Sequence, residues 1–148
     1  MRATASSAPS KPVPIAHIPD SVAPPVDQQF FERLRQMNDK FAAGVPATLA
    51  RLRELRRAFD AAAPDPALAA ELQQVLHTVA GSAATFGFRT FGAQARVLEQ
   101  RLRVLQAFDA VGKAEWDSWL RSLDHYLTWA HSDARADQFP DESGQEDI

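Results

Sequence analysis

The chain of 148 residues contains no cysteine and no long apolar run. The lack of cysteine excludes disulfide bonds, thiolate metal sites and thiol chemistry, and it suits a reducing compartment. No apolar run approaches the roughly 20 residues that a transmembrane helix needs. The first residues also lack the uninterrupted apolar segment of a secretory signal. We therefore expect a soluble, cytoplasmic protein that does not insert into a membrane.

The sequence also lacks the strong positive charge of a nucleic-acid-binding protein. Its net charge is −3. The segment 133–148 has six acidic residues and one arginine, which give it a charge of −5 and leave +2 for the rest of the chain. Because nucleic-acid binding needs a clustered basic surface, we expect no partner of that class.

Strand-type alternation, internal repeats and glycine-rich phosphate loops are absent from the sequence. Apolar residues instead recur at the helical period in five segments, which are residues 27–44, 46–63, 66–86, 89–109 and 113–132. Short connections between long amphipathic helices favour antiparallel neighbours. The predicted fold class is all-α, an antiparallel up-down four-helix bundle with an additional N-terminal capping helix.

Local signals predict where these helices begin and end. Gly44 is expected to end the first helix, and Pro46 suits the first turn of the second. Asp65 and Pro66 are typical of an N-cap and the position after it, and Gly87 of a left-handed C-cap. The expected inward-facing residues after the first helix are Leu49, Leu52, Phe59, Ala63, Leu68, Leu72, Val75, Leu76, Val79, Ala83, Phe86, Phe91, Ala95, Leu98, Leu102, Leu105, Phe108, Trp116, Trp119, Leu120, Leu123, Leu127 and Ala130, with Leu55 at the margin.

The two ends of the chain have a different composition from the middle. Residues 1–26 contain six of the ten prolines, mixed with alanine and serine, and are predicted to be a disordered or polyproline-type tail. Residues 27–132 are predicted to form the helical bundle. Residues 133–148 are predicted to be an acidic, disordered tail or a linker.

The most informative stretch is residues 76–87. At about 100° per residue, His77 lies roughly 150° from the middle of the apolar stripe of its helix and therefore faces solvent. Gly81 follows one turn later on the same face, although glycine costs about 1 kcal/mol in a helix interior. Small or polar residues around an exposed imidazole predict a surface on which another protein docks. Its expected residues are Ala70, Gln74, Ala80, Gly81 and Ala84.

A metal site at His77 is not expected. The residues one turn away, at positions 73, 74, 80 and 81, offer no histidine or carboxylate ligand. His125 and His131 have no comparable surroundings, and we expect them to be ordinary surface residues.

The pattern around His77 resembles the histidine-containing phosphotransfer (HPt) domain. The signature of that family is roughly His-x-Leu-Lys-Gly-Ser/Ala, with a glycine ten residues after the histidine and Leu-Glu further on. The matching positions lie between residues 27 and 131 and are His77, Val79, Gly81, Ser82, Gly87, Phe91, Leu98 and Glu99. Ala80 departs from the pattern, because the family has there a lysine that helps to hold the phosphoryl group.

The resemblance implies a phosphocarrier in a two-component phosphorelay, in which His77 exchanges a phosphoryl group with the aspartate of a receiver domain. An imidazole that is neutral near physiological pH is a suitable nucleophile. The receiver would supply Mg²⁺, so no cofactor is expected in this chain, and no kinase ATP-binding motif is present. The expected partners are a receiver domain and a hybrid histidine kinase, and the expected state is a monomer.

Ala80 leaves a second interpretation open. The chain could keep the HPt shape as a helical docking module without transferring phosphate. The absence of one exposed cation corresponds to about 1 kcal/mol, which would weaken the phosphorylated state without abolishing it. The carrier is therefore the favoured interpretation.

Overall fold

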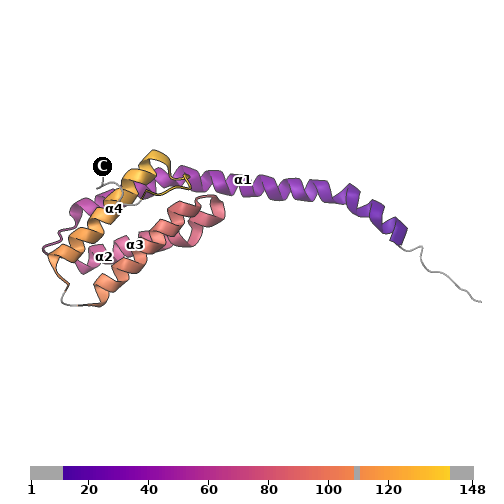
Figure 1. The fold of residues 1–148 in the computed structure, drawn as a ribbon. Helices are drawn as coiled ribbons and strands as arrows, with labels where there is room; N and C mark the ends of the chain where they lie inside the picture. The colour runs from indigo at the N-terminus through magenta and orange to yellow at the C-terminus, as the bar shows by residue number, and fades with distance from the viewer. Residues whose placement is uncertain (1–11, 109–110, 141–148) are drawn as a thin grey trace, which may run out of the picture. The chain divides into compact units, whose positions relative to one another are not determined.

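The computed structural model describes residues 12–108 and 111–140, with side chains from residue 27 onward (Figure 1). These residues form four α-helices and one 3-10 turn, and no strand. The elements are α1 (Pro12–Ala58), α2 (Pro66–Ser82), η2 (Ala83–Phe86), α3 (Arg89–Ala107) and α4 (Lys113–Asp133). The prediction of an all-α protein is confirmed.

The chain divides into two compact units, residues 1–39 and 40–148. In the first unit, the apolar side chains of α1 are largely open to solvent, with exposed fractions of 61% for Phe30 and 48% for Met37. The second unit contains the remainder of α1, the other helices and the whole buried core.

The predicted break between a first and a second helix is wrong, because α1 passes through Gly44 and Pro46 without interruption. Proline in a helix interior removes one backbone donor and crowds the preceding turn with its ring, a cost that packing has to offset. On either side of Pro46, Val45 and Leu49 are buried in the core and hold this stretch of α1 in place. A separate N-terminal capping helix is therefore not present among the described residues.

The start of α1 also differs from expectation. The predicted disordered tail covers residues 1–26, but the helix begins at Pro12. Residues 1–11 lie outside the described residues.

The predicted boundaries of the later helices agree with the structure to within a few residues. Asp65 is the N-cap of α2, and its carboxylate accepts a hydrogen bond from the amide of Ala67 at 2.9 Å. Gly87 adopts a left-handed conformation with φ 90°, which glycine tolerates without strain. Gly112 precedes α4, and its amide donates to Oε1 of Glu115 at 3.0 Å.

The core lies between the four helices of the second unit. Its largest fully buried side chains are Leu52, Leu72, Leu76, Phe91, Leu102, Trp119, Leu123 and Tyr126. Burying one such apolar side chain contributes about 1.5–3 kcal/mol. Two predictions of inward-facing residues are wrong, because Ala63 and Phe108 are exposed. Leu55, predicted at the margin, is buried.

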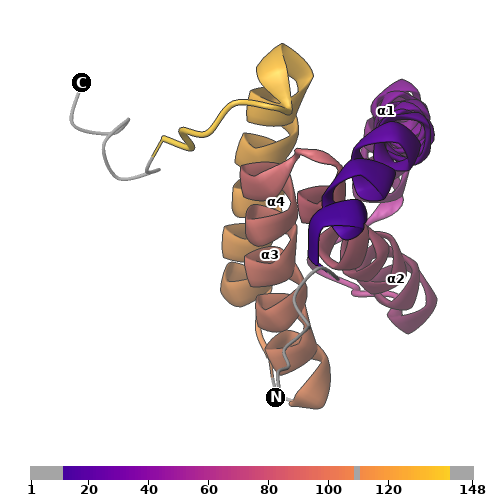
Figure 2. The same cartoon turned by 90° about the vertical axis from the view of Figure 1, so that its right-hand side faces the viewer.

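Helix α3 lies beside both α2 and α4 (Figures 1 and 2). Its contacts with α2 and the following η2 pair residue 99 with 77, 96 with 80, and 92 with 83, so α2 and α3 run in opposite directions. The approach is close at Gly92, where an added Cβ would lie 3.1 Å from Cβ of Ala83. On the α4 side, Trp119 Nε1 donates to the Leu98 carbonyl at 2.9 Å.

Residues after α4 fold back along that helix. Trp129 Nε1 donates to the Gln138 carbonyl at 2.7 Å, and a ring nitrogen of His125 donates to the Pro140 carbonyl at 2.8 Å. The ring of Phe139 packs against both aromatic side chains. Residues 134–140 thus have a defined place on the bundle, whereas the sequence predicts disorder from residue 133. Residues 141–148 lie outside the described residues.

Candidate functional site

His77 projects from the middle of α2 into solvent, and 59% of its side chain is exposed. The helix is held in this orientation by Leu72, Leu76 and Val79, which are buried in the core. The predicted position of His77 on the solvent face is therefore confirmed. Its exposure leaves the ring accessible to a second protein.

One nitrogen of the His77 ring is engaged by α3. Nδ1 lies 3.0 Å from Oε2 of Glu99. An ionised carboxylate has acceptor atoms only, so Nδ1 carries the hydrogen and donates it. In the neutral imidazole the lone pair is then on Nε2, the nitrogen that is not used in this contact. The geometry presents Nε2 as the nucleophilic atom.

Glu99 is a buried acid, with 4% of the residue exposed. Its charge is compensated by Arg103, one turn further along α3. Nη2 and Nε of Arg103 lie 2.8 and 3.1 Å from the same Oε2 atom that faces His77. A buried carboxylate is tolerated when it is paired and hydrogen-bonded. The pair with Arg103 therefore lets Glu99 stay charged beside the imidazole.

A second arginine of α3 reaches across to α2. Nη2 of Arg96 donates to the Ala80 carbonyl at 3.2 Å. Arg96 is exposed, and no carboxylate lies within ion-pair distance of it among the residues that the structure describes. Arg96 precedes Glu99 by three residues and Arg103 follows it by four, so all three share one face of α3.

Four of the five predicted docking residues are exposed around His77, namely Ala70, Gln74, Gly81 and Ala84. A side chain at Gly81 would meet nothing within 4 Å of its Cβ atom. Ala80 does not belong with them, because it is 8% exposed and lies in the core. The predicted place of Ala80 on the exposed surface is wrong because its side chain is packed in the core.

The hydroxyl groups near His77 are occupied within α2. Thr78 donates to the Gln74 carbonyl at 3.0 Å, and Ser82 donates to the Thr78 carbonyl at 2.8 Å. Bonds of this type are common for serine and threonine in helices. Among the described residues, the polar side chain that contacts His77 is therefore Glu99 of α3.

The sequence does not assign roles to Glu99, Arg96 or Arg103. Glu99 enters the sequence pattern only as part of Leu-Glu, with no stated contact, and Arg96 and Arg103 are not among the candidate site residues. The available signal was the spacing of Arg96, Glu99 and Arg103, which puts opposite charges on one helix face. That this face meets His77 depends on how α2 and α3 pack together.

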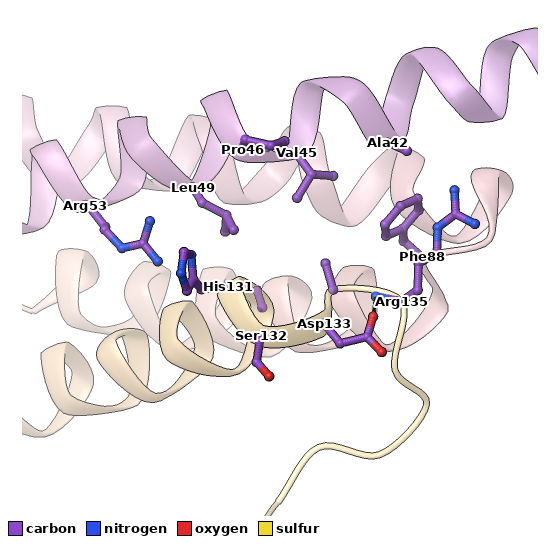
Figure 3. Close-up of a pocket in the computed structure, with 12 residues that line it drawn as sticks. Ala42, Val45, Pro46, Leu49, Arg53, Phe88, His131, Ser132, Asp133 and Arg135 are labelled. Carbon is purple, nitrogen blue, oxygen red and sulfur yellow. Dashed lines mark hydrogen bonds between the residues drawn. The ribbon is translucent and has the colours of Figure 1, made fainter.

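A hollow of about 500 Å³ lies between α1 and the end of α4, away from these residues (Figure 3). Val45 and Leu49 point into it from α1, while Arg53 and His131 face each other across it. The guanidinium of Arg135 lies 4.9 Å from the centre of the Phe88 ring at its other end. The residues that line this hollow include none of those around His77.

The described residues hold neither a cluster of metal ligands nor a membrane-spanning helix. Within the described part of the chain, no group of three or more histidine, cysteine, aspartate or glutamate residues is arranged to hold a metal ion. None of the described helices is both long and apolar enough to cross a membrane.

Comparison with known proteins identifies the family. The family model for the Hpt domain matches residues 30–128, which is more than half of the chain and includes His77, Glu99 and both arginines. Searches of curated proteins and of solved structures gave no significant match. Taken with the helical bundle and the exposed His77, the family match establishes that this chain belongs to the Hpt domain family.

Proposed function

We propose that the chain is a histidine phosphotransfer module in a two-component phosphorelay, in which His77 exchanges a phosphoryl group with the aspartate of a receiver domain. Hpt domains in general are phosphocarriers of phosphorelays and interact there with receiver and kinase domains. The observation that carries the proposal is the contact of His77 Nδ1 with the buried Glu99, at 3.0 Å, which directs the Nε2 lone pair outward.

The transfer is a nucleophilic substitution at phosphorus. The Nε2 lone pair attacks the phosphorus of an aspartyl phosphate, and the N–P bond forms as the P–O bond breaks. The electron pair of the broken bond returns to the aspartate carboxylate. The hydrogen on Nδ1 stays in place, so the positive charge that develops on the ring faces the carboxylate of Glu99. The reverse reaction passes the phosphoryl group to another aspartate.

Most of the electrostatic stabilisation is assigned to the partner. An in-line transfer needs charge neutralisation at the phosphoryl oxygens. We propose that the receiver supplies this with a carboxylate-bound Mg²⁺ and a lysine, and that this chain has no cofactor and no kinase activity of its own. Gly81 and Ala84 leave room beside His77 for close approach, and Ala70 and Gln74 extend the same docking surface.

We further propose that the protein is a cytoplasmic monomer whose other partner is a hybrid histidine kinase, with no role for nucleic acid or membrane. The proposed functional module is residues 27–132, an antiparallel up-down four-helix bundle. The opposite directions of α2 and α3 support that arrangement. So do the contact of Arg56 in α1 with Asp124 in α4 and that of Phe59, the residue after α1, with Trp116 in α4.

A docking module without phosphotransfer is the second candidate, and Ala80 is the residue that favours it. The side chain at this position is a buried methyl group and supplies no charge. The ordered contact between His77 and Glu99 weighs against this candidate, because docking alone does not require an oriented imidazole.

The experiment that tests the proposal is incubation of the full chain with a panel of phosphorylated receiver domains. We expect acid-labile, alkali-stable phosphate to appear on the wild-type protein and not on His77→Gln. ATP alone should give no label. Binding of a receiver without transfer from any member of the panel would favour the docking module instead.

A further inference from the structure

A phosphoryl group on Nε2 of His77 would place negative charge at an exposed position on α2. Stabilising such a group calls for a cation within reach, and Ala80 offers none on α2 itself. Two arginines of α3 flank Glu99, the residue that contacts His77. Arg96 donates to the Ala80 carbonyl of α2, and Arg103 binds Glu99 itself.

The two arginines stand on opposite sides of the His77 contact. Because α2 and α3 run in opposite directions, Arg96 lies toward the C-terminal part of α2, where it meets the Ala80 carbonyl. Arg103 lies toward the N-terminal part and binds Glu99. Each is within about one helical turn of Glu99, a distance that the long arginine side chain can span.

Their present partners separate the two candidates. Arg103 compensates the buried charge of Glu99 through two nitrogen atoms. Moving it would leave that carboxylate uncompensated, which is strongly unfavourable. Arg96 donates one hydrogen bond, at 3.2 Å, to a neutral carbonyl. Exchanging that acceptor for a phosphoryl oxygen replaces a neutral hydrogen bond with a stronger, charge-assisted one.

We propose that Arg96 is the phosphoryl-binding residue of this chain, which turns from the Ala80 carbonyl to the phosphoryl oxygens of phosphorylated His77. This inference rests on the proposed function of His77 as phosphoacceptor. No further bond forms or breaks in this step: the N–P bond is already in place, and the guanidinium keeps its protons and its charge. Arg103 stays with Glu99, and a cation from α3 thereby occupies the place that a side chain at position 80 leaves empty.

The test uses a small phosphoramidate salt as phosphoryl donor, so that no receiver is needed. We compare the lifetime of phosphohistidine in the wild type, Arg96→Ala, Arg96→Lys and Arg101→Ala. Arg101 is an exposed arginine of α3 that lies about 200° around the helix from Glu99 and serves as the matched control. We expect Arg96→Ala to shorten the lifetime about three- to fivefold, as for loss of one exposed ion pair. Arg96→Lys should restore part of it, and Arg101→Ala should change nothing.

Two further measurements exclude a merely structural effect. The side-chain Nε–H resonance of Arg96 should shift on phosphorylation, while that of Arg103 should move less. In the Arg96→Ala background, Ala80→Lys should lengthen the lifetime again, with circular dichroism confirming that each variant is folded. An unchanged lifetime in Arg96→Ala, together with an unmoved Arg96 resonance, would overturn the inference.

The outcomes also separate this inference from the proposed function. Suppose that receivers phosphorylate the wild type and that phosphohistidine lives as long in Arg96→Ala as in the wild type. Only the proposed role of Arg96 is then lost. If no receiver transfers phosphate but chemically formed phosphohistidine depends on Arg96, the relay function is lost and the role of Arg96 stands. If neither the phosphoramidate salt nor any receiver phosphorylates His77, the proposed function and the role of Arg96 are both overturned.

Discussion

Nδ1 of His77 on α2 lies 3.0 Å from Oε2 of Glu99 on α3. The imidazole is exposed and the carboxylate is buried, so the contact joins a reactive surface group to a fixed point in the core. It selects which ring nitrogen carries the hydrogen and limits rotation of the ring. The nucleophile is thus prepared by a neighbouring helix before any partner binds.

Replacing His77 by glutamine should abolish phosphoryl acceptance without unfolding the protein. Glutamine keeps a hydrogen-bond donor, and substitutions at exposed positions usually change stability by within about 0.5 kcal/mol. Transfer from a phosphorylated receiver and the melting temperature measure the two effects. His131→Gln, at an exposed position in the hollow between α1 and α4, is the control and should accept phosphate normally. Label retained in His77→Gln would move the acceptor to another residue.

Replacing Glu99 by leucine tests its role as a positioning residue. The variant should lose the preference for hydrogen on Nδ1 of His77, which the ¹⁵N chemical shifts of the two ring nitrogens report directly. Transfer should slow while receiver affinity stays nearly constant, because Glu99 does not reach the surface. Glu99→Gln, whose carbonyl oxygen still accepts from Nδ1, should retain part of the preference. Unchanged ring shifts in Glu99→Leu would contradict this role.

Replacing Gly81 by glutamine should move stability and transfer in opposite directions. An added side chain has open space at this position, and removing glycine from a helix interior stabilises it by up to about 1 kcal/mol. The same side chain would stand beside His77 and obstruct the receiver. Urea unfolding and transfer rate are the measurements.

Gly44→Gln is the matched control for Gly81. Gly44 is also an exposed helical glycine with open space around it, but it lies on α1. It should give a similar gain in stability and no loss of transfer. If Gly81→Gln transfers phosphate as fast as the wild type, the docking surface does not include position 81.

Replacing Pro46 by alanine tests the continuity of α1. Proline in a helix interior costs about 3 kcal/mol, so the variant should be more stable by up to that amount in urea unfolding. If Pro46 instead began a separate helix, where proline is well tolerated, the change would be close to neutral or destabilising.

Tyr126 should make the protein less stable in alkali. Burial raises the pKa of this phenol above its ordinary value of 10.0, and its hydroxyl donates to the Phe91 carbonyl at 2.9 Å. The protonated form is favoured in the folded state, so its stabilising contribution is complete below about pH 10 and is lost as the pH rises further. Stability should therefore fall above that pH.

The alkaline titration can be followed at a single group, since Tyr126 is the only tyrosine of the chain. Tyrosinate absorbance should appear together with the loss of helical circular dichroism. Tyr126→Phe should flatten the alkaline decline, at a cost of about 1 kcal/mol near neutral pH from the lost hydrogen bond. Ionisation at the ordinary pKa in a still helical protein would contradict the prediction.

The sequence predicts the helices of the second unit and the exposure of His77 because both follow from local rules. The helical period of the apolar residues predicts which face of α2 is buried. Asp65 marks the start of α2, and Gly87 marks the turn after η2. Local rules fail at Pro46, where packing of Val45 and Leu49 outweighs the preference of proline for a helix start. They also fail at Phe108, which directly follows the last residue of α3 and is 64% exposed.

The partners of His77 could not be predicted in the same way. Helical phase at Glu99 indicates only that this residue borders the apolar stripe. Its contact with His77, and that of Arg96 with the Ala80 carbonyl, depend on how far α3 slides along α2. The close approach of Gly92 to Ala83 belongs to the same packing, and no pattern within a single helix reveals it.

Gly87 has a consequence for the rotation of α3. With φ at 90°, it forms a short, fixed turn between η2 and α3. A helix advances by about 100° and 1.5 Å per residue, so one residue inserted between Gly87 and Arg89 would swing Glu99 by that angle away from His77. The sequence of α2 and α3 would be unchanged, yet His77 would lose its contact with Glu99. The length of this turn therefore belongs to the site as much as the side chains do.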